Sequence, residues 1–158
     1  MSNYPPSSDP WSGGGNQGPS GPPLASWGQR LGAYLVDGLI GGGIVVVGVI
    51  LGAVLGTVSD ALGVFFVVVG ILAGLGFVVW NLIQQGQTGQ TVGKKMLDIR
   101  LVRLDGQTPP GIGLSFGRYL LHVFIDSAIC YLGFLWPLWD QKRQTFADKI
   151  VNTVVVTA

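Results

Sequence analysis

An apolar run over residues 29–55 constrains the fold more than any other part of the sequence. A helix needs roughly 20 mostly apolar residues to cross a bilayer, and this run is long enough even without its first turn. It nevertheless carries Arg30 at its start and Asp37 two helical turns further in. Because a charge at the bilayer centre costs about 2.5–3.5 kcal/mol on insertion scales, Asp37 needs a charged partner, a proton or a functional reason. The run therefore predicts a membrane-embedded helix with a carboxylate inside it.

The composition also favours lipid as the solvent for much of the chain. Of 158 residues, 48% are hydrophobic and only 11% are charged, against about 25% charged in ordinary soluble domains. The net charge of +1 and the lack of a basic patch argue against a nucleic-acid partner. A single Cys130 and a single His122 exclude an intramolecular disulfide and a histidine or cysteine metal site, so we expect no cofactor. Since no nucleophile can be placed beside a base, we expect no enzymatic activity.

A second apolar run, residues 62–83, carries no charge and is also long enough to span a membrane. Only a short connection separates the two runs, so we predict antiparallel helices over 30–55 and 62–83. Glycines recur every four residues on both: Gly48, Gly52 and Gly56 on the first, Gly70 and Gly74 on the second. Such spacing lets helix backbones approach closely, although glycine is also common in apolar helices by chance. We interpret these positions as a packing seam and expect a homo-oligomer joined along glycine grooves.

The chain begins with a polar tail, residues 1–24, which precedes the membrane domain of residues 25–158. Proline, glycine, serine and asparagine dominate residues 1–23, which hold no lysine or arginine. Such a composition cannot offset the entropy of ordering, so we predict a disordered cytoplasmic tether, with an interaction tail as the alternative. The basic start and cleavage site of a secretory signal are lacking, so we expect the tail to remain attached.

A polar connection over residues 84–115 carries the densest positive cluster in the chain. Its cations are Lys94, Lys95, Arg100 and Arg103. By the positive-inside rule this loop should be cytoplasmic, which also places the N-terminus in the cytoplasm. Apolar residues alternate with charged ones over 96–103, and residues 151–157 are rich in β-branched side chains, so both are predicted to be strands. We expect these two strands to pair.

The third apolar segment, residues 116–139, contains Arg118, His122, Asp126 and Pro137. If it crossed the bilayer once, the cations of residues 142–149 would face the opposite side from the first positive cluster, which the positive-inside rule disfavours. Each predicted strand would also lack a partner for its backbone groups. We therefore favour a segment that enters the membrane and returns, with a break near residues 131–133, over a third full span.

The charged residues of the apolar segments are predicted to meet one another. Arg118, His122 and Asp126 follow each other at four-residue steps and so share one helix face. We expect Asp37 to pair with Arg118 or His122, and Arg30 to lie near Asp126 or an aspartate of the C-terminal region. Such a network has two interpretations: it fixes the register of the helices, or it forms a path for cations or protons.

Three stretches resemble the RDD family of bacterial membrane proteins: SWGQRLGAYLVDGLI, TVGKKMLDIRLVRLDG and WDQKRQTFADKIVNTVVV. Arg30 corresponds to the family arginine and Asp37 to the aspartate of the first helix. The last family aspartate corresponds to Asp148, with Asp140 and Asp126 close enough in sequence to compete. Ala147 departs from the histidine that often precedes this aspartate in relatives. The resemblance implies an integral membrane protein with transport proposed as its activity, sodium/proton exchange among the suggestions.

We therefore predict an all-α membrane protein of the bacterial cell (inner) membrane. It has two full spans, a third segment that re-enters or spans, and a short cytoplasmic two-stranded β element. The candidate functional charges are Arg30, Asp37, Arg118, His122, Asp126, Asp140 and Asp148. The expected function is a component of small-ion or small-solute transport, with Na⁺ or H⁺ as possible cargo and Asp37 as the charge-carrying site. The alternative is a non-transporting membrane scaffold or accessory subunit that binds protein partners.

Overall fold

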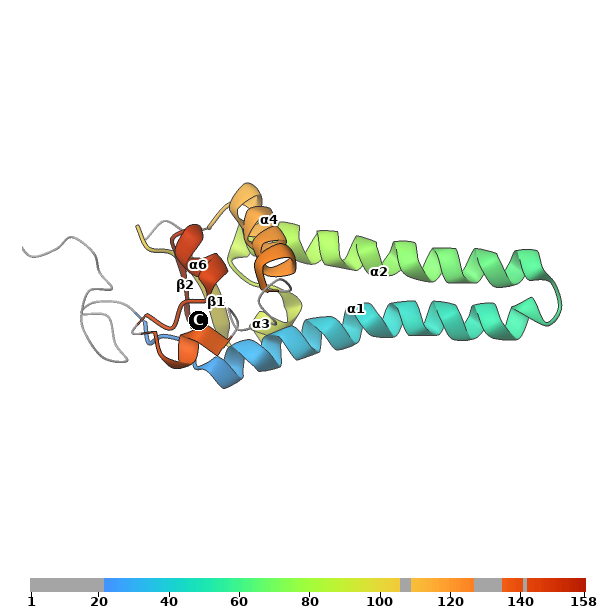
Figure 1. Ribbon diagram of the computed structural model, residues 1–158, viewed down its shortest axis with the longest axis horizontal. Coiled ribbons are helices and arrows are strands. Elements are labelled where there is room, and N and C mark those ends of the chain that lie inside the picture. The colour runs from blue at the N-terminus through green and yellow to red at the C-terminus, as the bar shows by residue number, and fades with distance from the viewer. Residues whose placement is uncertain (1–21, 106–108, 127–134, 141) are drawn as a thin grey trace, which may run out of the picture.

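The computed structural model describes residues 22–105, 109–126, 135–140 and 142–158. Two long helices, α1 (Trp27–Gly56) and α2 (Asp60–Thr88), run side by side in opposite directions. Shorter elements gather at one end of this pair, where α1 begins and α2 ends (Figure 1). We call this group the cap: α3 (Val92–Met96), β1 (Ile99–Arg103), α4 (Ile112–Leu121), α6 (Phe146–Ile150) and β2 (Thr153–Thr157).

Both long helices extend beyond the predicted ranges, and the start of α1 and the end of α2 are capped. At the start of α1, the Ser26 hydroxyl accepts a hydrogen bond from the Gln29 amide at 3.1 Å, and the Gln29 side chain accepts one from the Ser26 amide at 2.9 Å. This reciprocal capping box satisfies two amides that would otherwise lack partners. At the other end, α2 stops at Gly89, whose φ of 78° is the left-handed conformation that favours glycine. In the described part of the chain, α1 and α2 alone are long and apolar enough to cross a membrane.

The predicted glycine seam joins α1 to α2. A Cβ on Gly48 would lie 2.5 Å from the Cα of Gly70, and a Cβ on Gly63 would lie 2.8 Å from the Cα of Gly56. The two backbones are therefore close enough that only glycine fits at these positions. The seam is filled within one chain by the two helices. The expected homo-oligomer stays a prediction.

Replacing Gly48 with alanine should destabilise the helix pair by about 1–3 kcal/mol, because backbone atoms rather than flexible side chains obstruct the new methyl group. Gly43 lies on the same helix with nothing within 4 Å of a Cβ, so Gly43→Ala is the matched control. We expect Gly43→Ala to be neutral or slightly stabilising, since alanine favours helix over glycine. Thermal unfolding of the full chain in detergent measures both, and equal unfolding temperatures would contradict the seam.

The two predicted strands pair, as expected. β1 and β2 are antiparallel, with Leu101 opposite Val155. β1 begins at Ile99 rather than at residue 96, because residues 92–96 form the helix α3. One face of the sheet packs on the start of α1 through Ile99, Leu101 and Val155, which contact Ala25 and Ala33.

The end of the predicted tail belongs to this small sheet. Leu24 forms an isolated bridge with Val156 and is buried, so it is not part of a solvated tether. The amide of Ala25 donates to the carbonyl of Val155 at 2.9 Å. Residues 1–21 of the predicted tail lie outside the described residues. The sheet thereby ties the entrance of α1 to the C-terminal strand.

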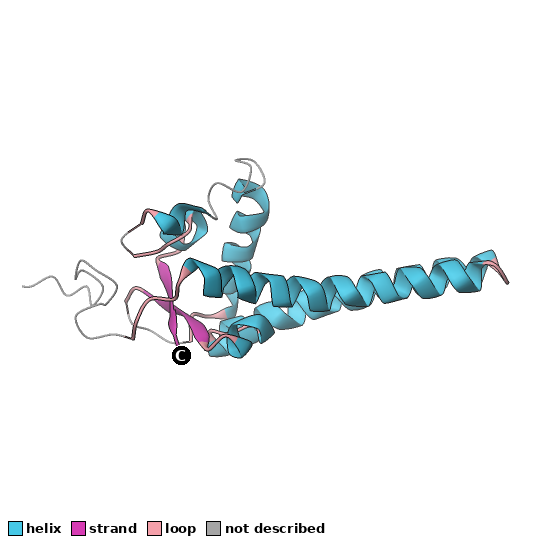
Figure 2. Cartoon of the chain, turned by 90° about the horizontal axis from the view of Figure 1, so that it is seen from below, coloured by secondary structure: helices cyan, strands magenta, loops and turns pink. Residues whose placement is uncertain are grey.

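The third apolar segment is described at its two ends, residues 116–126 and 135–139. It begins as α4, continues as a π-helix over His122–Asp126, and includes a 3₁₀ turn over Trp136–Leu138. Figure 2 shows α4 lying across the direction of the two long helices rather than beside them. Because β2 follows this segment and pairs with β1, both of its ends lie at the cap. The predicted break near residues 131–133 lies outside the described residues.

Candidate functional site

Three charged side chains from distant parts of the chain meet where the cap joins α1. Asp148 of α6 accepts from Arg30 of α1, with 2.9 Å between Oδ2 and Nη1, and from Arg118 of α4, with 2.6 Å between Oδ1 and Nε. Asp148 is 0% exposed and both arginines are 3% exposed. We call these residues the Asp148 cluster. It connects α1, α4 and α6 through one carboxylate.

Hydrogen bonds that are local in sequence help to hold the Asp148 carboxylate in place. In the motif TFAD, the Thr145 hydroxyl accepts from the Asp148 amide at 3.1 Å, and Oδ2 of Asp148 accepts from the Thr145 amide at 3.1 Å. This capping box begins α6. The hydroxyl of Thr153, in β2, donates to Oδ1 at 3.2 Å. Both carboxylate oxygens are therefore fully engaged.

The electrostatics of the cluster keep Asp148 ionised. Burial by itself would raise the pKa of Asp148, but the charges of Arg118 and Arg30 outweigh burial and hold the pKa well below its ordinary value. A carboxylate in this state does not take up a proton near neutral pH. Asp148 therefore acts as a fixed negative charge that compensates two buried guanidinium groups.

The expected pairing is right for Arg30 and wrong for Arg118. Arg30 meets a C-terminal aspartate, as predicted, and that aspartate is Asp148. Arg118 pairs with Asp148 and not with Asp37, because α4 lies across the helix pair and directs Arg118 toward α6. Within the described residues, Asp37 instead makes its hydrogen bonds with α2 and α3.

Asp37 joins three helices through a single oxygen atom. Its Oδ1 accepts from the Asn81 side chain of α2 at 2.9 Å and from the Gly93 amide of α3 at 2.7 Å. The Asn81 oxygen in turn accepts from the Val92 amide at 3.0 Å. These bonds satisfy two amides at the start of α3, where a negative charge is favourable.

The other candidate charges are His122, Asp140 and Asp126, which are not members of the Asp148 cluster. The Nε2 atom of His122 lies 3.2 Å from the hydroxyl of Tyr34, which links the π-helix to α1. Asp140 lies on the cap, where Oδ1 pairs with the Lys149 ammonium at 2.6 Å and Oδ2 accepts from the Gln144 amide at 2.9 Å. Asp126 ends the π-helix, and its side chain lies outside the described residues.

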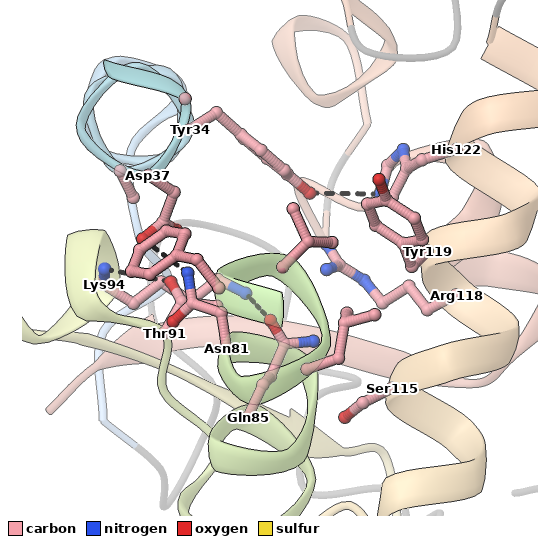
Figure 3. Close-up of a pocket in the computed structure, with 15 residues that line it drawn as sticks. Tyr34, Asp37, Asn81, Gln85, Thr91, Lys94, Ser115, Arg118, Tyr119 and His122 are labelled. Atoms are coloured by element: carbon pink, nitrogen blue, oxygen red, sulfur yellow. Dashed lines mark hydrogen bonds between the residues drawn. The ribbon is translucent and has the colours of Figure 1, made fainter. Parts of the chain in front are cut away.

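A cavity of ≈ 260 Å³ lies between α1, α2, α3 and α4, beside the Asp148 cluster (Figure 3). Most of the accessible surface that lines it is apolar, and the polar groups of several side chains converge on it. The polar side chains that line it are Tyr34, Asp37, Asn81, Gln85, Thr91, Lys94, Ser115, Arg118 and His122. Apolar walls with a few convergent polar groups are typical of sites for small ligands.

Lys94 is the most important site residue that sequence reasoning misplaced. The charge pattern places it in the densest positive cluster of a polar connection, but it is 3% exposed and its ammonium donates to Oε1 of Gln85. Burial lowers the pKa of Lys94 well below its ordinary value, and the charge of Arg118 lowers it further. Asn81 and Gln85 were also overlooked, although their four-residue spacing near the end of an apolar helix could have indicated an inward polar face.

Comparison with known proteins assigns the chain to a family. The sequence model of the RDD family matches residues 24–152. The chain belongs to the RDD family. The match spans Arg30, Asp37 and Asp148, and it confirms the resemblance inferred from sequence.

Relatives of this RDD protein include two mycobacterial sequences. It is 49% identical over 86 residues to a protein named proline-rich antigen homolog from Mycobacterium tuberculosis, covering 54% of this chain and 35% of the relative. It is 47% identical over 79 residues to the proline-rich antigen of Mycobacterium leprae, covering 49% of this chain and 31% of the relative. These matches thus span about a third of the curated relatives' length. No solved structure matches this RDD protein.

Proposed function

We propose that this RDD protein is a multi-pass protein of the bacterial cell membrane with its cap in the cytoplasm. Apolar side chains of α1 and α2 point away from the chain: Leu39 is 75% exposed and Leu72 is 61% exposed. A soluble protein would bury such surface, whereas lipid solvates it. The exposed cations Lys95 and Arg100 lie on the cap, and Asp60 lies at the opposite end of the helix pair. The positive-inside rule then favours a cytoplasmic cap.

In this arrangement the third segment stays at the cytoplasmic side of the bilayer. The helix α4 has ten residues, too few to span, and lies across the two long helices. It buries Ser115 and Arg118 and exposes Phe116 and Leu120. A helix with one apolar face toward lipid and one polar face toward protein is suited to the membrane interface. This supports a segment that dips into the membrane and returns.

The function that the geometry supports best is a component of small-ion or small-solute transport, with the cavity as its binding site. The observation that carries this proposal is that Asp148 and Asp37 differ in how fully their carboxylate oxygens are engaged. Asp148 is fully occupied by two arginines, whereas Asp37 is half-buried on the cavity wall with one oxygen engaged. Ionisable groups inside apolar helices are typical of ion and proton pathways. Two helices enclose no pathway alone, so further helices from copies or partners are required.

Asp37→Asn tests this proposal because asparagine keeps an oxygen that can accept from Asn81 and Gly93. We expect the variant to insert and fold, while Na⁺-dependent or H⁺-dependent flux into sealed vesicles is lost. Asp60→Asn, at the far end of α2, is the matched control and should retain flux. A pH-sensitive dye inside the vesicles measures proton movement. Full flux in a folded Asp37→Asn variant would overturn the role of Asp37.

The second candidate is a membrane scaffold or accessory subunit. It is favoured by the two hydrogen bonds from Asn81 and Gly93 to Asp37, because these bonds hold α3 against the helix pair. On this alternative the charges fix the cap and the exposed apolar faces bind partner helices. Wild-type vesicles that show no flux of Na⁺ or H⁺, together with loss of folded protein on Asp37→Ala, would favour the scaffold.

A further inference from the structure

The cavity lining and the adjacent Asp148 cluster together hold more positive charge than negative charge. Arg30 and Arg118 share the single carboxylate of Asp148. Lys94 adds a third cation, and Asp37 is the second carboxylate nearby. Among the described residues around the cavity, three cations therefore face two carboxylates. Buried charges are normally compensated, so the local excess is one positive charge.

Lys94 is the buried cation that forms no ion pair among the described residues. Its ammonium donates to Oε1 of Gln85, a neutral amide oxygen. In the described ranges, the ion pairs of this structure join other residues, and Lys94 forms none with a carboxylate. A buried ammonium in this position either loses its proton or gains an anion. An anion in the cavity would supply the absent charge.

Ser115 points to the same conclusion from the other side of the cavity. Its hydroxyl is buried and has no hydrogen-bond partner among the described residues. Ser115 lies on α4 one helical turn before Arg118, and both side chains line the cavity (Figure 3). Buried hydroxyl groups in native proteins normally have partners, so an orphan facing a cavity indicates a ligand that would accept its proton.

The rest of the cavity is suited to an amphiphile. Its apolar lining consists of Ala33, Phe77, Val78, Leu82 and Tyr119. At its rim Gly38 and Tyr119 are exposed, and the neighbouring Leu39 is an exposed apolar residue. The rim therefore belongs to the apolar surface of the protein. A volume of ≈ 260 Å³ holds a head group rather than a whole lipid.

We propose that the cavity binds a small oxyanion, a carboxylate or phosphate group, between the ammonium of Lys94 and the hydroxyl of Ser115. The anion is either the head group of a lipid or other amphiphile or a free ion that enters the cavity. Ligand binding at this site is an equilibrium property, so it does not require transport by the protein.

Thermal unfolding of the full chain in a neutral detergent tests the site. The probes are dihexanoyl phosphatidylglycerol, the zwitterionic dihexanoyl phosphatidylcholine, and inorganic phosphate. We expect the anionic lipid to raise the unfolding temperature by about 5–10 °C at saturating concentration, and the zwitterionic lipid to raise it much less. A shift with inorganic phosphate alone would identify a free ion as the source, and a shift with the anionic lipid only would identify a head group.

Two variants and one control separate binding from folding. Lys94→Gln should abolish the ligand-induced shift, whereas Lys95→Gln, at the exposed neighbouring position, should retain it. Ser115→Ala should raise the unfolding temperature of the unliganded protein, because it removes an unpartnered hydroxyl, and should reduce the ligand-induced shift. The proposal is overturned if no anion produces a shift, or if folded Lys94→Gln keeps the full shift.

Discussion

Replacing Asp148 with asparagine should lower the free energy of unfolding by about 3–5 kcal/mol, because it leaves Arg30 and Arg118 buried without a counter-charge. The amide also presents an NH₂ group to a guanidinium donor. Since small domains are stabilised by only about 5–15 kcal/mol, we expect little folded protein in the membrane fraction. Thermal unfolding in detergent measures the loss for whatever protein accumulates.

Asp140→Asn is the matched control for this substitution. Asp140 also pairs with a cation, but its partner Lys149 has a 40% exposed side chain. Partly solvated pairs contribute about 0–1 kcal/mol, so the control should unfold close to the wild type. In a double-mutant cycle of Arg118→Leu and Asp148→Leu, the double variant should lose less stability than the sum of the single variants. Additive losses in the cycle would contradict a buried ion pair.

The pH dependence of the protein's stability follows from the Asp148 cluster. The pKa of Asp148 is depressed in the folded protein below its ordinary value of 3.8, because the charges of Arg118 and Arg30 outweigh the effect of burial. A group with a depressed folded-state pKa stabilises the protein above its unfolded-state pKa and loses that contribution as the pH falls toward the folded-state value. The stability difference between wild type and Asp148→Asn should therefore be constant near neutral pH and shrink in strong acid.

Features that depend on local sequence could be predicted, whereas the partners of the charges could not. The two long helices follow from apolar length, and the strands follow from alternation and β-branching. The choice of Asp148 for Arg30 depends on β1 pairing with β2, which brings α6 beside α1 over 118 residues of sequence. One local signal was available: a threonine three residues before Asp148 is typical of a capping box and places this aspartate at a helix start.

Lys94 illustrates the limit of reading charge patterns. Lys94 and Lys95 are adjacent and chemically identical, yet one is buried and the other exposed. Successive residues on a helix point about 100° apart, so the difference is set by the face of α3 that packs on α1. That face is chosen by tertiary contacts of a five-residue helix, which has too few residues to show a periodic pattern. Lys94 counts only as evidence for topology in the positive-inside rule, but its burial beside the cavity makes it a candidate binding group.

The charges of the molecule thus divide into two sets with different consequences. In the Asp148 cluster both carboxylate oxygens are engaged, and the ion pairs fix α4 and α6 to α1. Asp37 and Lys94 line the adjacent cavity and have remaining capacity to interact. Substitutions in the first set should therefore change stability, whereas charge-only substitutions in the second should change binding or flux with smaller effects on folding.

The glycine at position 93 determines whether this second set can form, so Gly93→Ala should be among the most damaging small substitutions. A Cβ there would lie 2.9 Å from the carbonyl carbon and 3.0 Å from the Cα of Ala33, and would overlap the Ala33 oxygen still more closely. Because these are backbone atoms of α1, α3 must move away and lose the bond from the Gly93 amide to Asp37. Overpacking and a lost charged hydrogen bond together predict a loss of about 3–5 kcal/mol.

The control for this prediction is Gly113→Ala on α4, where nothing lies within 4 Å of a new Cβ. It should be neutral or slightly stabilising because alanine is the better helix former. Thermal unfolding of the two variants in detergent separates close packing from a general effect of removing glycine. A Gly93→Ala protein as stable as Gly113→Ala would show that α3 does not pack against α1, and the buried position of Lys94 would then lose its structural basis.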